Sequence, residues 1–338
     1  MLNFKISDIW NELKKININQ NNSPFIKRDF LKTAGNDPVY LSIAKSFPTN
    51  DCGILLDSQA VNFPEDLTFP LSENFEIKTY LGDKGNKFLW FFLKKNTGYE
   101  KQFEIICYDL AVKAIKETNS KKTIESFINN IKKWQDFLKE KKEELSDSKI
   151  KGLFSELYFL KNILIKNVGI KKAIQGWKPI DETHDFVLKN LSIEIKSTTT
   201  SPIKKIKISS LKQLDETLTK KLYIYLLQMG ENTGESLPDM IDSIRQIINN
   251  DNEDFYLFES KLMKEKYFEQ FREKYKNRKF FKNNEQLYLI EKNFPRLRET
   301  DLKIINRDGI ISASYEININ ACNDYKININ DFYNEIKN

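Results

Sequence analysis

Short apolar runs separated by turn-forming residues characterise the first hundred residues of the chain. Runs of β-branched and aromatic residues bounded by Pro, Gly, Asn and Asp are typical of β-strands. They predict strands at 39–44, 53–56, 75–80, 88–94 and 103–107, after a short helix at 9–15. Between residues 124 and 138, apolar side chains recur at i, i+3, i+4 and i+7, which predicts a helix. We therefore predict a β-rich N-terminal domain, residues 1–142, that ends in this helix.

A charged segment, KEKKEELSDSK at 139–149, is predicted to separate this domain from a second one at 148–338. The second domain is predicted to contain a helix (148–165), three strands (185–188, 191–198, 205–208), a further helix and a strand (222–227). The further helix begins at Ser210, which has capping-box spacing to Gln213. This order, αβββαβ, predicts an α/β core at about 148–230. A helical stretch from Pro238 and a final β-rich segment form a mixed C-terminal extension.

The segment THDFVLKNLSIEIKS, residues 183–197, predicts a hairpin with Lys189-Asn190 as its two-residue turn. The resulting cross-strand pairs are Leu188 with Leu191, Val187 with Ser192, Phe186 with Ile193, and Asp185 with Glu194. The face that carries Phe186 is wholly apolar, and the other presents Asp185, Glu194 and Lys196. A slip of one residue would move the charges onto the apolar face, so the pattern favours this register.

Two carboxylates in directly opposed positions indicate a cation site. Cross-strand neighbours lie about 5 Å apart at Cβ, and like charges there destabilise a hairpin. A divalent cation between Asp185 and Glu194 removes that repulsion, and Mg²⁺ prefers such oxygen ligands. Lys196 follows Glu194 by two residues and shares its face. It could steer or deprotonate an attacking water and offset charge on a phosphate, while the metal lowers the pKa of the water.

The helix predicted at 148–165, before the hairpin, carries a third carboxylate, that of Glu156. Its buried stripe is predicted to consist of Ile150, Leu153, Leu157, Leu160 and Leu164. Glu156 lies at the edge of this stripe, one turn after Gly152. A glycine inside a helix costs about 1 kcal/mol relative to alanine. We interpret Gly152 as allowing close approach of the helix to the hairpin, which would aim Glu156 at the carboxylate pair.

Glu156 on a helix, then Asp185, then Glu194-Ile195-Lys196 in the order αβββαβ resembles the PD-(D/E)XK phosphodiesterase superfamily. The segments GLFSELYFL, GW, HDF, IEIKS and ISSLKQL are similar to those of bacterial PD-(D/E)XK motif proteins from restriction and phage-defence neighbourhoods. The resemblance implies a restriction-endonuclease-like core, with a mixed sheet flanked by helices. His184 stands where the motif has proline, a departure that affects recognition more than mechanism.

The resemblance also implies a Mg²⁺-dependent DNA endonuclease, in which Mn²⁺ is expected to substitute. The residues implied for catalysis are Asp185, Glu194, Lys196 and Glu156. Those implied for metal binding are Asp185, Glu194 and Ile195, and the candidates for support are Gln213, Ser197 and His184. The implied partner is double-stranded DNA, with a homodimer, a cognate methyltransferase or other defence-system proteins as further candidates.

Alternatives to this interpretation stay open. The core could be degenerate, so that the protein is a noncatalytic DNA-binding or assembly subunit of a defence complex. Asp181, two residues after Pro179, is a second candidate for the motif aspartate. His184 has a structural role as its alternative, and Gln213 a helix-capping one. Lysines at 204, 205 and 207, and a basic stretch at 274–282, could contact phosphates or form solvated faces.

Composition narrows the class of protein without selecting a function. The chain has 338 residues, 54 Lys and Arg against 48 Asp and Glu, and a net charge of +6, which permits a polyanionic partner. Its three distant cysteines and single histidine predict neither a disulfide framework nor a structural zinc site, and fit a reducing cytoplasm. Neither a secretion signal nor a membrane span is indicated.

Overall fold

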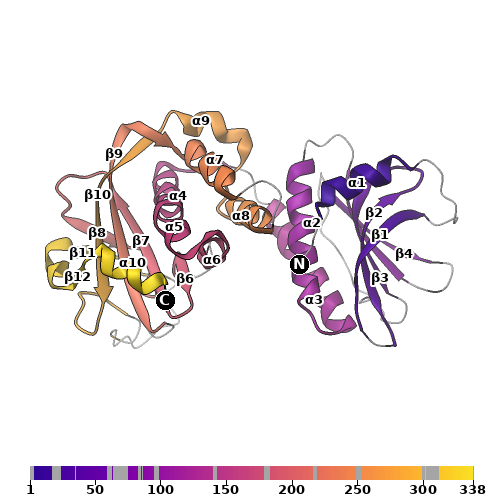
Figure 1. Ribbon diagram of the computed structural model, residues 1–338, viewed down its shortest axis with the longest axis horizontal. Helices are drawn as coiled ribbons and strands as arrows, with labels where there is room; N and C mark the ends of the chain where they lie inside the picture. The colour runs from indigo at the N-terminus through magenta and orange to yellow at the C-terminus, as the bar shows by residue number, and fades with distance from the viewer. Residues whose placement is uncertain are drawn as a thin grey trace. The chain divides into compact units, whose positions relative to one another are not determined.

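The computed structural model describes residues 4–16, 24–34, 36–58, 63, 75–82, 85, 87–94, 99–139, 143–178, 183–215, 219–248, 253–298, 301 and 312–337. The chain forms two compact units, Met1–Lys141 and Lys142–Asn338 (Figure 1). Within the described ranges, no helix has the length and apolar character needed to cross a membrane. Cys52, Cys107 and Cys322 are all free thiols.

Over its described residues, the first unit combines a five-stranded antiparallel sheet with three helices. The strands are β1 (Phe25–Lys32), β2 (Val39–Ser46), β3 (Cys52–Ser58), β4 (Phe75–Leu81) and β5 (Lys87–Leu93), and the helices are α1 (Ile6–Lys14), α2 (Glu100–Ile115) and α3 (Ser120–Lys139). The strand order is β1-β2-β3-β5-β4. Trp10 of α1 stacks on Phe103 of α2 with ring centroids 5.5 Å apart, and Phe103 also contacts Phe91 of β5 at 5.1 Å. These rings join α1 and α2 to the sheet.

The predicted strand at 103–107 is wrong, because these residues lie within α2. Phe103, Ile106, Cys107, Leu110 and Ala114 are all buried, a spacing that follows the helical repeat. A five-residue apolar run fits a strand and a helix equally well, and the helical period becomes visible only over the longer segment. Strand β1 was not predicted, since its sequence FIKRDFLK is charged and most of its residues are at least partly exposed.

The second unit contains a mixed five-stranded sheet and a separate two-stranded one. The strands are β6 (Phe186–Leu188), β7 (Leu191–Thr198), β8 (Lys205–Ile208), β9 (Lys221–Ser236), β10 (Lys279–Ile290), β11 (Tyr315–Asn318) and β12 (Lys326–Ile327). The larger sheet has the order β12-β10-β9-β7-β6, and β8 pairs with β11 in the smaller one. Strands β7 and β9 run parallel, whereas the other neighbours are antiparallel.

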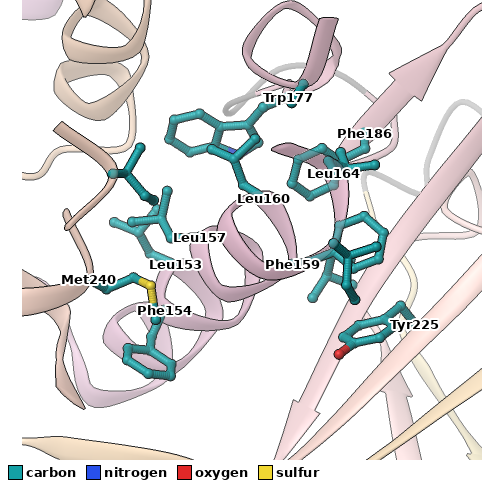
Figure 2. Close-up of a cluster of buried hydrophobic side chains, with 14 of the residues drawn as sticks. Leu153, Phe154, Leu157, Phe159, Leu160, Leu164, Trp177, Phe186, Tyr225 and Met240 are labelled. Carbon is teal, nitrogen blue, oxygen red and sulfur yellow. The ribbon is translucent and has the colours of Figure 1, made fainter. Parts of the chain in front are cut away.

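Helices cover one face of the larger sheet. They are α4 (Asp147–Phe159), the π-helix η1 (Leu160–Leu164), α5 (Ile165–Val168), α6 (Ile170–Gly176), α7 (Leu237–Ile248), α8 (Glu253–Lys264), the 3-10 helix η3 (Glu269–Phe271), α9 (Arg272–Lys276) and α10 (Ile329–Lys337). The 3-10 helix η6 (Ile319–Tyr325) lies on the other face, where its Ile319 and Cys322 pack with β8 and β11. Ser146 caps α4 by accepting a hydrogen bond from the Lys149 N–H at 3.3 Å. Figure 2 shows the resulting core, in which Phe159 packs on Phe186 and Tyr225.

The opposite face of the sheet is covered as well. Leu222, Ile224 and Leu226 of β9 pack there against the β8–β11 pair, in a second cluster that includes Ile206, Ile208, Ile317 and Cys322. Residues 191–195 of β7 are likewise buried on both faces of the sheet. Burial on both sides is usual for parallel strands and explains the long apolar run of β9 at 222–227, whereas β7 alternates apolar residues with Ser192, Glu194 and Lys196.

The predicted αβββαβ order differs from the structure in two respects. Strand β8 leaves the main sheet and pairs with β11 instead. In addition, residues 211–214 form a turn, so the helix predicted to begin at Ser210 is wrong over the described residues 210–215. The Gln213 side chain accepts a hydrogen bond from the Ser209 N–H at 2.9 Å, which stabilises the turn in place of a capping box. The architecture is α/β, with mixed and antiparallel sheets flanked by helices.

The interpretation of Gly152 is also wrong, since a Cβ at this position meets no atom within 4 Å. The helix does not approach the hairpin closely there. Gly152→Ala is therefore expected to raise the free energy of unfolding by about 1 kcal/mol, because alanine loses less backbone entropy in a helix. Urea unfolding of both proteins measures this difference. A less stable Gly152→Ala protein would show that the position has a constraint beyond its helical backbone.

Candidate active site

The hairpin of β6 and β7 has the predicted register over its three ladder pairs, Phe186–Ile193, Val187–Ser192 and Leu188–Leu191. Asp185 lies one residue before β6, outside the ladder. Its backbone carbonyl accepts a hydrogen bond from the Lys178 N–H at 2.8 Å. Its carboxylate Oδ2 accepts a second one from the Ile195 N–H at 2.6 Å, across the hairpin. Asp185 is thereby fixed beside β7, next to Glu194.

Glu194 and Lys196 form an ion pair on β7. Lys196 Nζ donates to Glu194 Oε1 at 2.7 Å and to Gln213 Oε1 at 3.1 Å. Glu194 is only 1% exposed, because the face of β7 that it occupies is covered rather than open to solvent. The structure thus brings Glu194, Lys196 and Gln213 together, with Gln213 linking the lysine to the turn after β8.

The buried carboxylates have strongly altered acidity. The pKa of Glu194 is raised to about 8, chiefly by burial and then by the charge of Asp185, while Lys196 opposes the shift. Burial also raises the pKa of Asp185, against the opposing effects of the Ile195 N–H and of Lys196. Both groups therefore hold protons more tightly than free carboxylic acids do. Such shifts are typical of functional sites.

Glu156 of α4 belongs to the same electrostatic cluster. Its Oε2 accepts a hydrogen bond from the Trp177 Nε1–H at 2.9 Å. Burial raises its pKa well above the usual range, and the charges of Asp185, Glu265 and Glu194 raise it further. The carboxylates of Asp185, Glu194 and Glu265 therefore all lie close enough to Glu156 to affect its acidity.

The ligand set fits a hard divalent cation. Among the described residues, no three His, Cys, Asp or Glu side chains form a group that could hold a metal ion by themselves. The implied set needs only the carboxylates of Asp185 and Glu194 together with the Ile195 backbone carbonyl. Within the described part of the chain, Glu194 Oε2 is buried without a hydrogen-bond partner. A buried carboxylate oxygen without a donor is costly, and a cation would satisfy it.

The other two candidate supporting residues, His184 and Ser197, lie in different surroundings from each other. His184 is 4% exposed, its ring makes a hydrogen bond with the Gln213 backbone, and burial lowers its pKa. Its Nε2 is buried with no hydrogen-bond partner in the described residues. Ser197 lies on the face of β7 opposite to Lys196, since successive strand residues alternate. Asp181, the alternative motif aspartate, lies outside the described residues.

The basic residues outside the motif are largely neutralised by the chain's own acids. Lys205 of β8 pairs with Glu316 at 2.8 Å. In the stretch at 274–282, Lys276 pairs with Glu273 at 2.7 Å and Lys282 with Glu285 at 2.6 Å. Lys274 and Arg278 also pair with acidic residues, Glu144 and Asp147. These contacts favour a structural or solvated role over a dedicated phosphate grip.

Three residues beside the site were not predicted from the sequence. Trp177 contacts Glu156 directly, Lys261 of α8 donates to backbone carbonyls at the end of α6, and Glu265 contributes to the charge around Glu156. Trp177 belongs to the GW segment, which was noted only as part of a resemblance. Lys261 and Glu265 follow the predicted core by more than thirty residues, and no spacing pattern connects them to the motif.

An Asp followed by Glu-x-Lys at the hairpin of a mixed sheet, with a glutamate on the preceding helix, defines a PD-(D/E)XK type of protein. The chain matches the family model described as "Putative PD-(D/E)XK family member, (DUF4420)" over residues 6–320. It therefore belongs to this family, which confirms the resemblance found in the sequence. No curated protein and no solved structure matches the chain. PD-(D/E)XK nucleases typically use divalent metal ions.

Proposed function

We propose that the protein is a metal-dependent DNA endonuclease that hydrolyses phosphodiester bonds of double-stranded DNA in type II-like restriction or phage defence. The observation that carries the proposal is the Lys196–Glu194 pair beside Asp185, with Glu194 Oε2 buried and without a donor in the described residues. A purely structural ion pair would have its oxygens satisfied. The family supports a nuclease, and a cytoplasmic location accords with three free cysteines.

Each site residue has a chemical task in this proposal. Asp185, Glu194 and the Ile195 carbonyl would hold Mg²⁺, with Mn²⁺ as a substitute. When bound, the cation would lower the pKa of an attacking water and polarise the phosphate. Lys196 supplies a positive charge that stabilises charge developing on the phosphate oxygens, and Gln213 keeps its ammonium group oriented. Glu156 supports the site from α4 as a further acceptor.

A nicking assay tests the proposal. Supercoiled plasmid and phage DNA, methylated and unmethylated, would be incubated with the full chain in Mg²⁺, in Mn²⁺ and in chelator. We expect nicked or linear DNA with the cations and none with chelator. DNA left intact under every cation, methylation state and added partner would contradict the nuclease and favour a noncatalytic DNA-binding or assembly subunit.

Cation binding is expected to stabilise the folded protein independently of any DNA. Because a ligand that binds only the folded state stabilises it by mass action, Ca²⁺ at 100 times its Kd should add about 2.7 kcal/mol. Asp185→Asn should reduce this gain. Thermal unfolding with and without Ca²⁺ measures it, and Asp331→Asn, at an exposed position on α10, is the matched control. Equal gains for wild type and Asp185→Asn would place the cation elsewhere.

A further inference from the structure

Trp177 occupies a tightly built junction between α6 and β6. It forms an isolated β-bridge with Phe186 and is fully buried, beside the core of α4 and η1 shown in Figure 2. Gly176, immediately before it, makes this approach possible. A Cβ at residue 176 would lie 2.7 Å from Leu188 Cδ2 and 3.2 Å from the Val187 carbonyl oxygen. The close approach of Gly176 to β6 therefore fixes the Trp177 backbone, to which the indole ring is attached.

The polar edge of this buried ring points at the active site. Its Nε1–H donates to Glu156 Oε2 at 2.9 Å. Burial and the charges of Asp185, Glu265 and Glu194 all raise the pKa of Glu156, and the Trp177 N–H is the influence that lowers it. These neighbours disfavour the ionised form of Glu156, and the indole N–H is a fixed donor that holds its side chain in one orientation.

Trp177 is itself held from α8. Lys261 is 8% exposed, and its ammonium group donates to the Ile174 carbonyl oxygen at 2.6 Å and to the Trp177 carbonyl oxygen. These carbonyls end α6, where backbone acceptors lack helical partners and attract positive charge. Phe258, also on α8, packs on the indole with ring centroids 5.8 Å apart. One helix therefore contacts both the backbone and the ring of Trp177.

We propose that Trp177 is a positioning residue that sets the orientation of Glu156 in the carboxylate cluster, and that Lys261 of α8 holds Trp177 for this purpose. The inference rests on the proposed nuclease function for its catalytic meaning. It extends the functional unit beyond the segments that carry the family resemblance, the last of which ends at residue 214, to α8. A tryptophan needed only for packing could be replaced by phenylalanine, which keeps an aromatic ring and loses the N–H donor.

The hydrogen bond can be tested by ¹⁹F NMR of protein labelled with 5-fluorotryptophan. The chain has four tryptophans, and the Trp177 signal is the one lost in Trp177→Phe. Glu156→Gln and Lys261→Met are expected to shift this signal and leave those of Trp10, Trp90 and Trp134 in place. Lys161→Met, which removes an ion pair to Glu235, is the control and should leave all four unchanged. An unshifted Trp177 signal in Glu156→Gln overturns the proposal, whatever the protein does to DNA.

The kinetics of DNA nicking test whether the contact between Trp177 and Glu156 matters for catalysis. Trp177→Phe should lower kcat by about tenfold to a hundredfold with little change in KM, because the fixed donor that orients Glu156 is lost. Phe258→Leu disturbs the packing of the same ring and keeps the donor, so its loss of kcat should be much smaller. Equal kcat values for wild type and Trp177→Phe overturn the positioning role while the nuclease stands. If wild type cuts no DNA, the proposed function fails, and the ¹⁹F shift in Glu156→Gln still decides whether Trp177 orients Glu156.

Discussion

Lys196→Ala is expected to abolish detectable DNA nicking while leaving the protein folded. The ammonium group donates to Glu194 and Gln213 on a strand whose packing depends on other residues. Its removal deletes positive charge next to the reacting phosphate, and losing one such preorganised group typically costs about 10²–10³-fold in kcat. DNA affinity should fall only slightly, since one phosphate contact among several contributes little to nonspecific binding.

The measurement is plasmid nicking and DNA binding in parallel for wild type, Lys196→Ala and Glu194→Ala. Glu194→Ala should lose cleavage and cation binding together, whereas Lys196→Ala keeps the ligands. Lys205→Ala is the matched control, because Lys205 is an exposed lysine paired with Glu316 on β11. If Lys196→Ala nicks DNA as fast as wild type, the nuclease would remain and its active site would have to lie elsewhere.

The metal-free protein is expected to lose stability as the pH rises from about 4.5 to about 8. The pKa of Glu194 is near 8 in the folded protein because of burial and the Asp185 charge, and its ordinary value is 4.5. Between these values the folded chain holds a proton that the unfolded chain has released. Since the folded state then binds more protons, the free energy of unfolding decreases with rising pH and levels off above pH 8.

Glu194→Gln removes this titration and should be more stable than wild type at pH 8 without metal, by on the order of a few kcal/mol. Urea unfolding across pH 5–9 in chelator measures both curves. Glu316→Gln, at an exposed position of β11, is the control and should follow the wild-type curve. Saturating Ca²⁺ should flatten the wild-type decline, because the cation favours the ionised carboxylates. Parallel curves for wild type and Glu194→Gln would contradict the assigned shift.

The site hairpin could be predicted because its information is local. A two-residue turn and strict alternation fix the register, and β7 and β8 begin and end at the predicted residues. The helix predicted to begin at Ser210 is wrong because its local signal was not specific. Two polar residues at capping-box spacing occur by chance, and the Gln213 side chain instead meets Lys196, 17 residues earlier. Contacts of that kind depend on how the strands pack.

The support of Glu156 could not be predicted, because it arises between distant segments. Trp177 and Lys261 are 84 residues apart, and neither periodicity nor spacing relates them. The short apolar run at 103–107 was wrongly predicted for a different reason. Five residues fit the repeat of a strand and that of a helix, and only the neighbouring turns of α2 distinguish the two. Family resemblance pointed to the candidate site residues, whose surroundings become visible only in three dimensions.

The order of elements in the second unit also has consequences for folding kinetics. The β6–β7 hairpin closes over two residues, and such hairpins form in about 1–10 μs. Strands β9 and β10 are neighbours in the sheet although residues 237–278, with α7, α8 and α9, separate them in sequence. Pairing across a long intervening segment carries a larger loop-closure entropy and is slower. We therefore expect the motif hairpin to form early and the β9–β10 pairing late, so that α8, which lies in the intervening segment and carries Lys261, docks beside Trp177 after the hairpin has formed.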